Sequence, residues 1–145
     1  MSFVPYLHFR GDCADAMQFY AEVFGGSLEM MTFADGPPEM FPDGELPAEA
    51  ANQIMHACLT HSGGALMASD FPPGVAGDPQ QAVSISHAVG DAASGKALFD
   101  RLTEGGGVVL MDFADTFWAD GFGMVKDRFG THWMISGPGK EPMAG

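Results

Sequence analysis

The chain has 145 residues, of which 46% are hydrophobic and 17% charged, so it suits one globular domain with a packed core. Six basic residues stand against 19 acidic ones, and the net charge of −13 repels polyphosphates. We therefore expect neither nucleic acid nor an anionic membrane as a partner. No apolar run approaches the roughly 20 residues that span a bilayer, and no secretory signal is visible, so we expect a cytoplasmic protein.

The first half of the chain predicts the order βαβββ. Asp12 offers a helix N-cap, and apolar residues then recur at helical spacing until Gly25 and Gly26 stop the pattern. Ser62 and Gly63 form a hairpin turn between the last two predicted strands. The strands are expected over residues 3–9, 27–34, 52–61 and 64–70.

The segment 35–50 separates two of these strands and contains four prolines and five acidic residues, with no basic residue. It predicts a loop. Long loops are often functional, so this one is either a lid or a solvated excursion on the surface.

The second half repeats the order of the first. A strand is expected over 82–91, a helix follows until the glycines 105–107, and "VVLMDF", "GFGMVKD" and "THWMIS" read as three strands. At an offset of 79, Gly11-Asp12 falls on Gly90-Asp91, which indicates two copies of one unit. The predicted division is module one at 3–70, a Pro- and Gly-rich linker at 71–81, module two at 82–136 and a tail at 137–145.

Three stretches carry a resemblance to a known family: "PYLHFRGDCADAMQFYAEVFGG", "HACLTHSGGALMASDFPPG" and "DTFWADGFGMVKDRFGTHWMI". They resemble the PhnB-like branch of the vicinal oxygen chelate superfamily, also called the glyoxalase and bleomycin-resistance fold. The resemblance implies an α+β fold, in which two βαβββ modules form an eight-stranded incomplete barrel around a cavity with the helices outside. It also implies a homodimer. Some relatives carry a methyltransferase label, but the glycines here only end helices, so we expect no methyl-donor site.

Metal-dependent members of this superfamily use four inward His, Gln or Glu ligands. The corresponding positions here are Pro5, Ser84, Ala68 and Met134, none of which offers the expected donor. We therefore expect no metal and no other cofactor. The alternative is a lyase or dioxygenase that holds a divalent metal with divergent ligands such as His56, His132 and Asp70.

His56 and Asp70 are polar residues in otherwise apolar predicted strands, so they need hydrogen bonds if they are buried. Both are expected to face the cavity, where a carboxylate beside an imidazole would support general base chemistry. The structural alternative is that Asp70 caps the turn into Pro72-Pro73 and His56 anchors a loop.

Two more residues are candidates for the pocket. His132 lies near the last turn and either lines the cavity mouth or has a structural role. Trp118 precedes a predicted strand, and we expect its indole to contact a ligand, another subunit or the core. The period of two within a strand predicts that His8 and His87, equivalent in the repeat, both point away from the cavity.

Three residues are given mainly structural roles. Asp127 is expected to shape the turn before the last strand. Cys13 and Cys58 are expected to be reduced, because two cysteines in 145 residues make no disulfide scaffold. Cys13 lies near a helix start, where a thiolate is favoured, or it is a small packing residue.

The function expected from these observations is that of a PhnB-like, metal-free protein that binds a small molecule in an apolar pocket, with its reaction unassigned. The pocket would carry His56, Asp70, Trp118 and His132. Besides the metal-dependent enzyme, a further alternative is a dimeric resistance protein that sequesters a cationic drug between acidic and aromatic walls.

Overall fold

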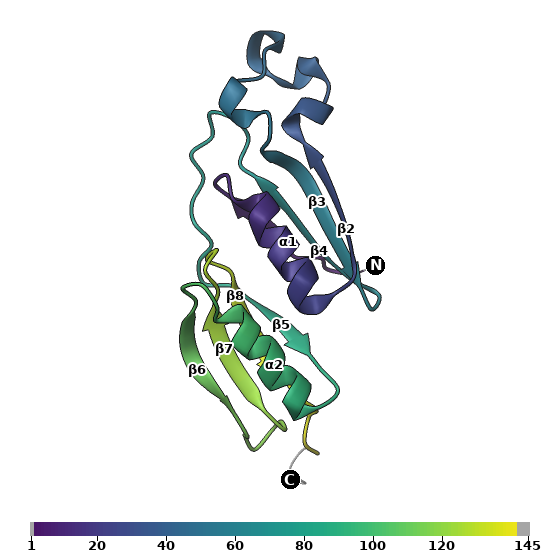
Figure 1. Cartoon of the computed structure of the whole chain (residues 1–145), viewed down its shortest axis with the longest axis vertical. Coiled ribbons are helices and arrows are strands. Elements are labelled where there is room, and N and C mark those ends of the chain that lie inside the picture. Colours follow the sequence, from purple (N-terminus) through teal and green to yellow (C-terminus); the bar gives the residue numbers. More distant parts are fainter. Residues whose placement is uncertain (1, 142–145) are drawn as a thin grey trace. The chain divides into compact units, whose positions relative to one another are not determined.

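The computed structural model describes residues 2–141, so the last four residues of the predicted tail lie outside the described part. The chain forms two compact units, one ending at Pro79 and the other beginning at Gln80. Each contains one α-helix and a four-stranded sheet (Figure 1). The predicted α+β class and the βαβββ order of both modules are confirmed.

The first unit contains β1 (Tyr6–Phe9), α1 (Cys13–Phe24), β2 (Ser27–Thr32), β3 (Ile54–His61) and β4 (Gly64–Asp70). The second contains β5 (Ser84–Ala88), α2 (Ala92–Leu102), β6 (Val108–Ala114), β7 (Phe122–Lys126) and β8 (His132–Ser136). The hairpin turn between β3 and β4 forms as predicted, with positive φ at both Ser62 and Gly63.

The two sheets share one topology. The strand order is β1-β4-β3-β2 in the first unit and β5-β8-β7-β6 in the second. In each sheet the first strand pairs in parallel with the last, and the other neighbours are antiparallel. This shared order confirms the internal repeat, and neither sheet closes into a barrel by itself.

In the first unit, α1 covers one face of the sheet (Figure 1). Its buried side chains, Met17 and Tyr20 among them, lie on the side of the sheet where Leu7 and Phe9 of β1 and Ala68 of β4 are also buried. Each large apolar side chain buried in this way contributes about 1.5–3 kcal/mol. Strand alternation and the cross-strand register place a second set of residues on the opposite side. We call this side the far face of the first sheet, and it carries Tyr6, His8, Glu29, Met31, His56, Cys58, Met67 and Ser69.

The second unit has the same arrangement. Phe99 and Leu102 of α2 are buried on the side of the sheet where Val125, Trp133 and Ile135 are also buried. The opposite side, the far face of the second sheet, carries Ser84, Ser86, Met124, Lys126, His132 and Met134.

His8 and His87 do not share a face, which corrects the sequence prediction. His8 pairs with Ser69 and lies on the far face of the first sheet, whereas His87 pairs with the fully buried Ile135 on the α2 side. By face, β1 matches β5 at an offset of 78, whereas the helices match at 79, so the second unit has one residue more between its first strand and its helix. This difference reverses the face of the residues that an offset of 79 would equate in β1 and β5.

The segment 35–50 is built from short 3-10 turns rather than being structureless. The turns span Phe33–Asp35, Pro38–Met40, Pro42–Gly44 and Ala48–Ala50. Phe33 and Phe41 are buried and their rings meet edge to face at 6.2 Å, while Ala50 is 1% exposed. The segment therefore packs on itself and on the first unit, and its role as a lid remains a prediction.

Within residues 2–141, none of the helices combines the length and the apolar character that a membrane span requires.

Candidate functional site

The far face of the first sheet carries a continuous chain of four rings. His56 Nδ1 lies 3.0 Å from the Tyr6 hydroxyl oxygen, a hydrogen-bond distance. The centre of the Tyr6 ring lies 5.7 Å from that of His56 and 5.2 Å from that of His8. His8 in turn stacks on Phe71 at 5.3 Å with an interplanar angle of 18°. We call His56, Tyr6, His8 and Phe71 the ring chain.

The hydrogen bond to Tyr6 fixes the His56 imidazole through Nδ1 and leaves Nε2 as the ring nitrogen for another partner. Tyr6 is 40% exposed and His56 is half-buried, so both are accessible. Arg10, the only lysine or arginine before Pro79, is held by the Gly77 carbonyl through two of its nitrogens. The ring chain therefore offers stacking surfaces and hydrogen-bonding groups without a fixed positive charge.

Sequence reasoning found His56 but missed the rest of the ring chain. Tyr6 and His8 alternate with the buried Leu7 and Phe9, so the period of two does place them on one face. The prediction failed for His8 because it took Pro5, three residues earlier, as the position that faces the cavity, whereas the accessible face is the one that Tyr6 and His8 share. Phe71 follows β4 directly and had no local signal.

Asp70 lies on the other side of the first sheet, so the expected pair with His56 is not formed. The side chain is 1% exposed, and one carboxylate oxygen accepts hydrogen bonds from the backbone N–H groups of Gly11 at 2.7 Å and Cys13 at 3.1 Å. The other oxygen accepts from the Ile54 N–H at 2.8 Å. Asp70 thus ties the start of α1 to the start of β3, rather than capping the turn into Pro72-Pro73.

Asp12 occupies the N-cap position of α1, but its side chain makes no capping hydrogen bond. Burial raises the pKa of Asp12, and the negative charge of Asp70 raises it further. A hydrogen bond from its own backbone N–H acts in the opposite direction but is outweighed. Burial, followed by the charges of Asp70 and Asp12, also raises the pKa of the Cys13 thiol well above its ordinary value. Cys13 is 0% exposed and is therefore a packing residue rather than a thiolate nucleophile.

The other two pocket candidates lie in the second unit. His132 is half-buried on the far face of its sheet, and its buried Nδ1 has no hydrogen-bond partner. Trp118 is 41% exposed and meets the rings of Phe117 at 4.9 Å and Phe122 at 5.3 Å, both edge to face. Phe117 is itself 74% exposed, so these two rings present apolar surface to solvent.

Asp127 shapes the turn before β8, as the sequence predicts. It is 3% exposed and accepts hydrogen bonds from the backbone N–H groups of Phe129 at 2.9 Å and Thr131 at 3.1 Å. Its second oxygen accepts from Trp133 Nε1 at 2.8 Å, which fixes the largest side chain of β8 in the core.

The proposed divergent metal ligands are not gathered at one place. His56 and Asp70 lie on opposite faces of the first sheet, and His132 belongs to the second unit. Of the four family positions, Ala68 is fully buried toward α1 while Met134 lies on a far face. Across residues 2–141, no three or more His, Cys, Asp or Glu side chains come together as metal ligands.

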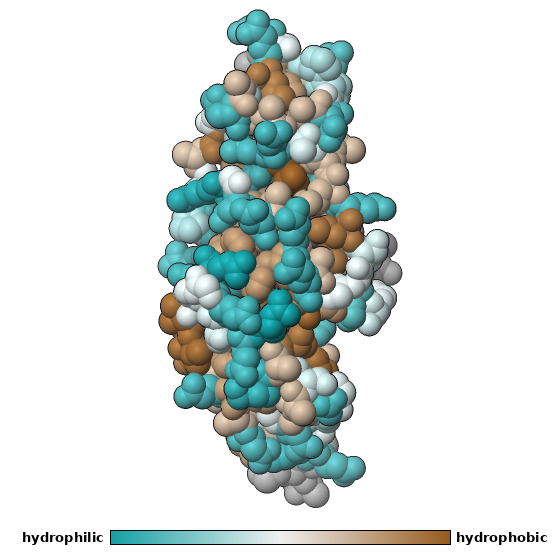
Figure 2. Space-filling model, in the orientation of Figure 1, coloured by the Kyte–Doolittle hydropathy of each residue, from teal (hydrophilic) through white to brown (hydrophobic). Residues whose placement is uncertain are grey.

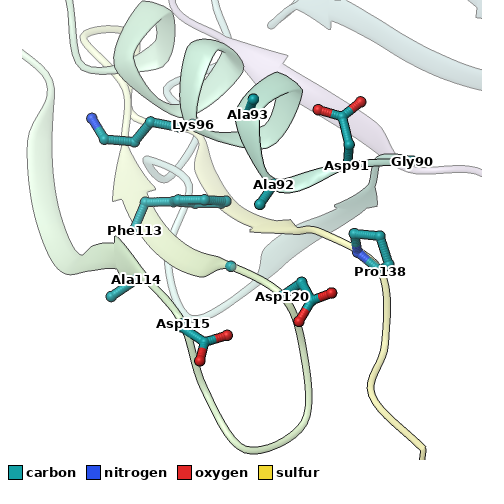
Figure 3. A pocket seen from close by; sticks show the side chains of 11 residues that line it. Gly90, Asp91, Ala92, Ala93, Lys96, Phe113, Ala114, Asp115, Asp120 and Pro138 are labelled. Carbon is teal, nitrogen blue, oxygen red and sulfur yellow. The ribbon is translucent and has the colours of Figure 1, made fainter.

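Each unit also has a hollow. In the first unit, about 630 Å³ opens between the segments 47–53 and 71–77, with Arg10 and the ring-chain residue Phe71 in its wall. In the second, about 740 Å³ opens at the start of α2 over Phe113 (Figure 3). The charged groups there are largely paired within the protein: Asp91 with Ser94, Lys96 with Asp100 and Asp115 with Lys140.

Comparison with known proteins agrees with this architecture. The family model of the Glyoxalase/Bleomycin resistance protein/Dioxygenase superfamily matches residues 3–135. Protein YjdN of Escherichia coli (strain K12) is 34% identical over 158 residues, covering 98% of this chain and 99% of YjdN.

Two solved structures extend the comparison. The crystal structure of protein PA1353 from Pseudomonas aeruginosa has a TM-score of 0.84 at 41% identity, covering 95% of this chain and 98% of that one. The PhnB protein of Bacillus cereus, described as a putative 3-demethylubiquinone-9 3-methyltransferase, has a TM-score of 0.69 at 20% identity. The alignment covers 94% of this chain and 99% of the PhnB chain. At that identity the likeness concerns the fold alone.

Proposed function

Because the chain belongs to the Glyoxalase/Bleomycin resistance protein/Dioxygenase superfamily, we propose that it is a PhnB-like protein that binds a small molecule on the far face of its first sheet. The observation that carries the proposal is the hydrogen bond between Tyr6 and His56 within the ring chain. A preoriented imidazole among aromatic rings on an accessible strand face is a recurrent feature of ligand sites.

The ring chain favours a planar, uncharged ligand. Each aromatic contact of a stacked ligand contributes about 0.5–1.5 kcal/mol beyond its buried area. A hydrogen bond to His56 Nε2 adds about 0.5–1.5 kcal/mol. Among residues 2–79, Arg10 is the only lysine or arginine and is engaged by Gly77, so this part of the chain offers little support to a ligand that depends on a carboxylate or phosphate. His132 and Trp118 are the corresponding candidates for ligand contact in the second unit.

We propose that this binding needs no divalent metal. Zinc, nickel, iron and manganese require three or four N or O donors that converge at about 2.0–2.2 Å. Proline, serine, alanine and methionine occupy the family's ligand positions, and the divergent set His56, Asp70 and His132 does not fit such an ion. No chemical step is therefore assigned to a metal at those positions.

We further propose that the protein is a cytoplasmic homodimer. The edge strand β6 exposes four consecutive apolar side chains, Val108 to Met111, each 38–54% accessible. Figure 2 shows apolar surface on the side of the second unit where Figure 1 draws β6. Edge strands normally carry protective charges, so an uncovered apolar edge favours association. Light scattering should give twice the chain mass, and Leu110→Glu should yield the monomer; a monomeric wild type would contradict the dimer.

Binding is tested first by a thermal-shift screen of neutral aromatic molecules on protein treated with a chelator. Calorimetry on the strongest ligand should then show an affinity about 10-fold weaker for His56→Ala and several-fold weaker for Tyr6→Phe. His61→Ala is the matched control, because His61 ends the same strand at the hairpin turn and lies outside the ring chain.

Each result separates the alternatives. Unchanged affinity in His56→Ala would remove the ring chain as the site, and affinity lost in Gln53→Ala instead would place the ligand in the hollow beside segment 47–53. A requirement for one equivalent of a divalent metal would favour the lyase or dioxygenase. A cationic drug that quenches the exposed Trp118 at stoichiometric concentration would favour sequestration.

A further inference from the structure

The far face of the first sheet carries a second group of residues that the ring chain does not use. Cys58 of β3 is directly opposite Met67 of β4, and His56 of β3 is directly opposite Met31 of β2. Residues opposite each other across strands have Cβ atoms about 4.5–5.5 Å apart. Residues two apart on one strand, such as His56 and Cys58, are about 7 Å apart on the same face.

These four side chains are one thiol, two thioethers and one imidazole, and we call Met31, His56, Cys58 and Met67 the soft-donor group. Met31 is 44% exposed and the other three are half-buried, so an ion can reach them from solvent. The cysteine is the accessible one of the two in the chain, since Cys13 is fully buried on the other side of the sheet.

We propose that the soft-donor group binds one Cu(I) ion per chain. Thiolate and thioether sulfur are the donors that select this soft monovalent ion, and imidazole also suits copper. When Nδ1 of His56 donates its hydrogen to the Tyr6 hydroxyl oxygen, the lone pair of Nε2 is free for a metal. A metal-binding histidine is usually oriented in this way, by a hydrogen bond that its other ring nitrogen donates.

The same donors discriminate against divalent ions. Zinc prefers four ligands from thiolate, imidazole and carboxylate, of which the soft-donor group supplies two. Glu29 is opposite Cys58 on β2, but within residues 2–141 no three His, Cys, Asp or Glu side chains gather as metal ligands. On binding, the S–H bond of Cys58 breaks, an S–Cu bond forms and the proton passes to the buffer. Copper remains in the +1 state, so no oxidant or reductant takes part in the step.

This inference goes beyond the proposed function and does not depend on it. The two share His56, but Cys58 and Met67 belong to the soft-donor group alone. Cys58→Ser should therefore weaken copper binding about 100-fold or more and leave the thermal shift by an aromatic ligand unchanged, while Tyr6→Phe, which frees the shared His56, should weaken both.

The test is an anaerobic competition in which the reduced protein takes Cu(I) from the chromophoric chelator bicinchoninate. We expect one ion per chain, an affinity reduced about 100-fold or more in Cys58→Ser and about 10-fold in Met67→Leu. Met30→Leu is the matched control, because Met30 is next to Met31 but pairs with Ala57 on the α1 side. Its affinity should equal that of the wild type.

A second measurement covers the case in which a variant folds poorly. In the wild-type protein, one equivalent of Cu(I) should protect Cys58 from iodoacetamide, as read by mass spectrometry of the peptide. Failure to compete with the chelator, full affinity in Cys58→Ser, or undiminished alkylation of Cys58 with copper present would each overturn the proposal. Tighter binding of Zn(II) than of Cu(I) would do the same.

Discussion

The two units have the same strand order but fix the start of their helix in different ways. In the second unit Asp91 caps α2 locally, accepting the backbone N–H of Ser94 at 2.7 Å and its hydroxyl at 2.8 Å. In the first unit the corresponding Asp12 makes no such bond, and the cap comes from Asp70 at the end of β4. A local cap forms with the helix, whereas the cap of α1 forms only when β4 is in place.

The far faces of the two sheets also differ in the residues that they carry. The first presents the ring chain and the soft-donor group, with no lysine or arginine among its residues. The second presents serines and methionines together with Lys126 and His132. Duplication has therefore kept the fold while the residues available for binding diverged, and our proposals concern the first unit.

The largest expected effect is that of Asp70→Ala. Removing the carboxylate leaves three backbone N–H groups without their acceptor in a buried site, so the free energy of unfolding of the first unit should fall by about 3–5 kcal/mol. Both tyrosines lie in the first unit and both tryptophans in the second, so tyrosine and tryptophan emission report the units separately during urea unfolding.

The tyrosine transition should move to lower urea much more than the tryptophan transition. A change below about 1 kcal/mol would mean that water replaces Asp70 as the acceptor and that the contrast between the two helix starts has little energetic weight.

The sequence predicted what depends on neighbouring residues. The helical periodicity up to Gly25, the Ser62-Gly63 turn and the role of Asp127 all rest on contacts within a few positions, and all three formed as expected, whereas the predicted N-cap bond of Asp12 did not. The role of Asp70 could not be predicted, because its partners at Gly11 and Cys13 are 59 and 57 residues away. Its face was also misassigned, since periodicity shows that residues share a face without showing which face the helix covers.

The candidate site was predicted only in part for the same reason. His56 was selected as a polar residue in an apolar strand, and it does lie on an accessible face next to Tyr6. His8 was excluded because it lies three residues past Pro5, the position assumed to face the cavity. An error of one residue in that starting position is enough to reverse the face.

The second largest effect is expected for Asp127→Asn, the buried carboxylate of the other unit. An asparagine can keep one oxygen for Phe129 and Thr131, but it then turns its amide N–H toward the indole N–H of Trp133. One buried donor thus loses its acceptor, which costs about 2–3 kcal/mol. Here the tryptophan transition should shift and the tyrosine transition should not, the reverse of the Asp70 result; a larger shift of the tyrosine signal would contradict the assignment.

A smaller effect is expected from Gly11→Ala. Gly11 has φ of 103°, which an L-residue with a side chain adopts only with strain, so the substitution should cost about 1–2 kcal/mol. Gly90→Ala is the matched control from the second unit, because Gly90 has no positive φ and an added Cβ would meet nothing within 4 Å. Equal urea midpoints for the two variants would show that the positive φ at Gly11 does not require a residue without a side chain.

The smallest effects concern acid, and they should have opposite signs in the two units. The hydrogen bonds from the backbone and hydroxyl of Ser94 lower the pKa of Asp91 below 3.8, so its contribution to stability is complete above that pH and is lost as the pH falls through the folded pKa. Burial raises the pKa of Asp12, so its ionised form opposes folding, and this cost disappears as the pH falls.

Urea unfolding of Asp91→Ala and Asp12→Asn should therefore be compared with that of the wild type between about pH 3 and pH 7. At neutral pH the first variant should be less stable than the wild type and the second more stable, and both differences should shrink toward the acid end. If Asp12→Asn were destabilised at neutral pH, the Asp12 carboxylate would be making a favourable contact in its charged form. The contrast between a helix capped by its own N-cap residue and one capped by Asp70 would then be weaker than the geometry indicates.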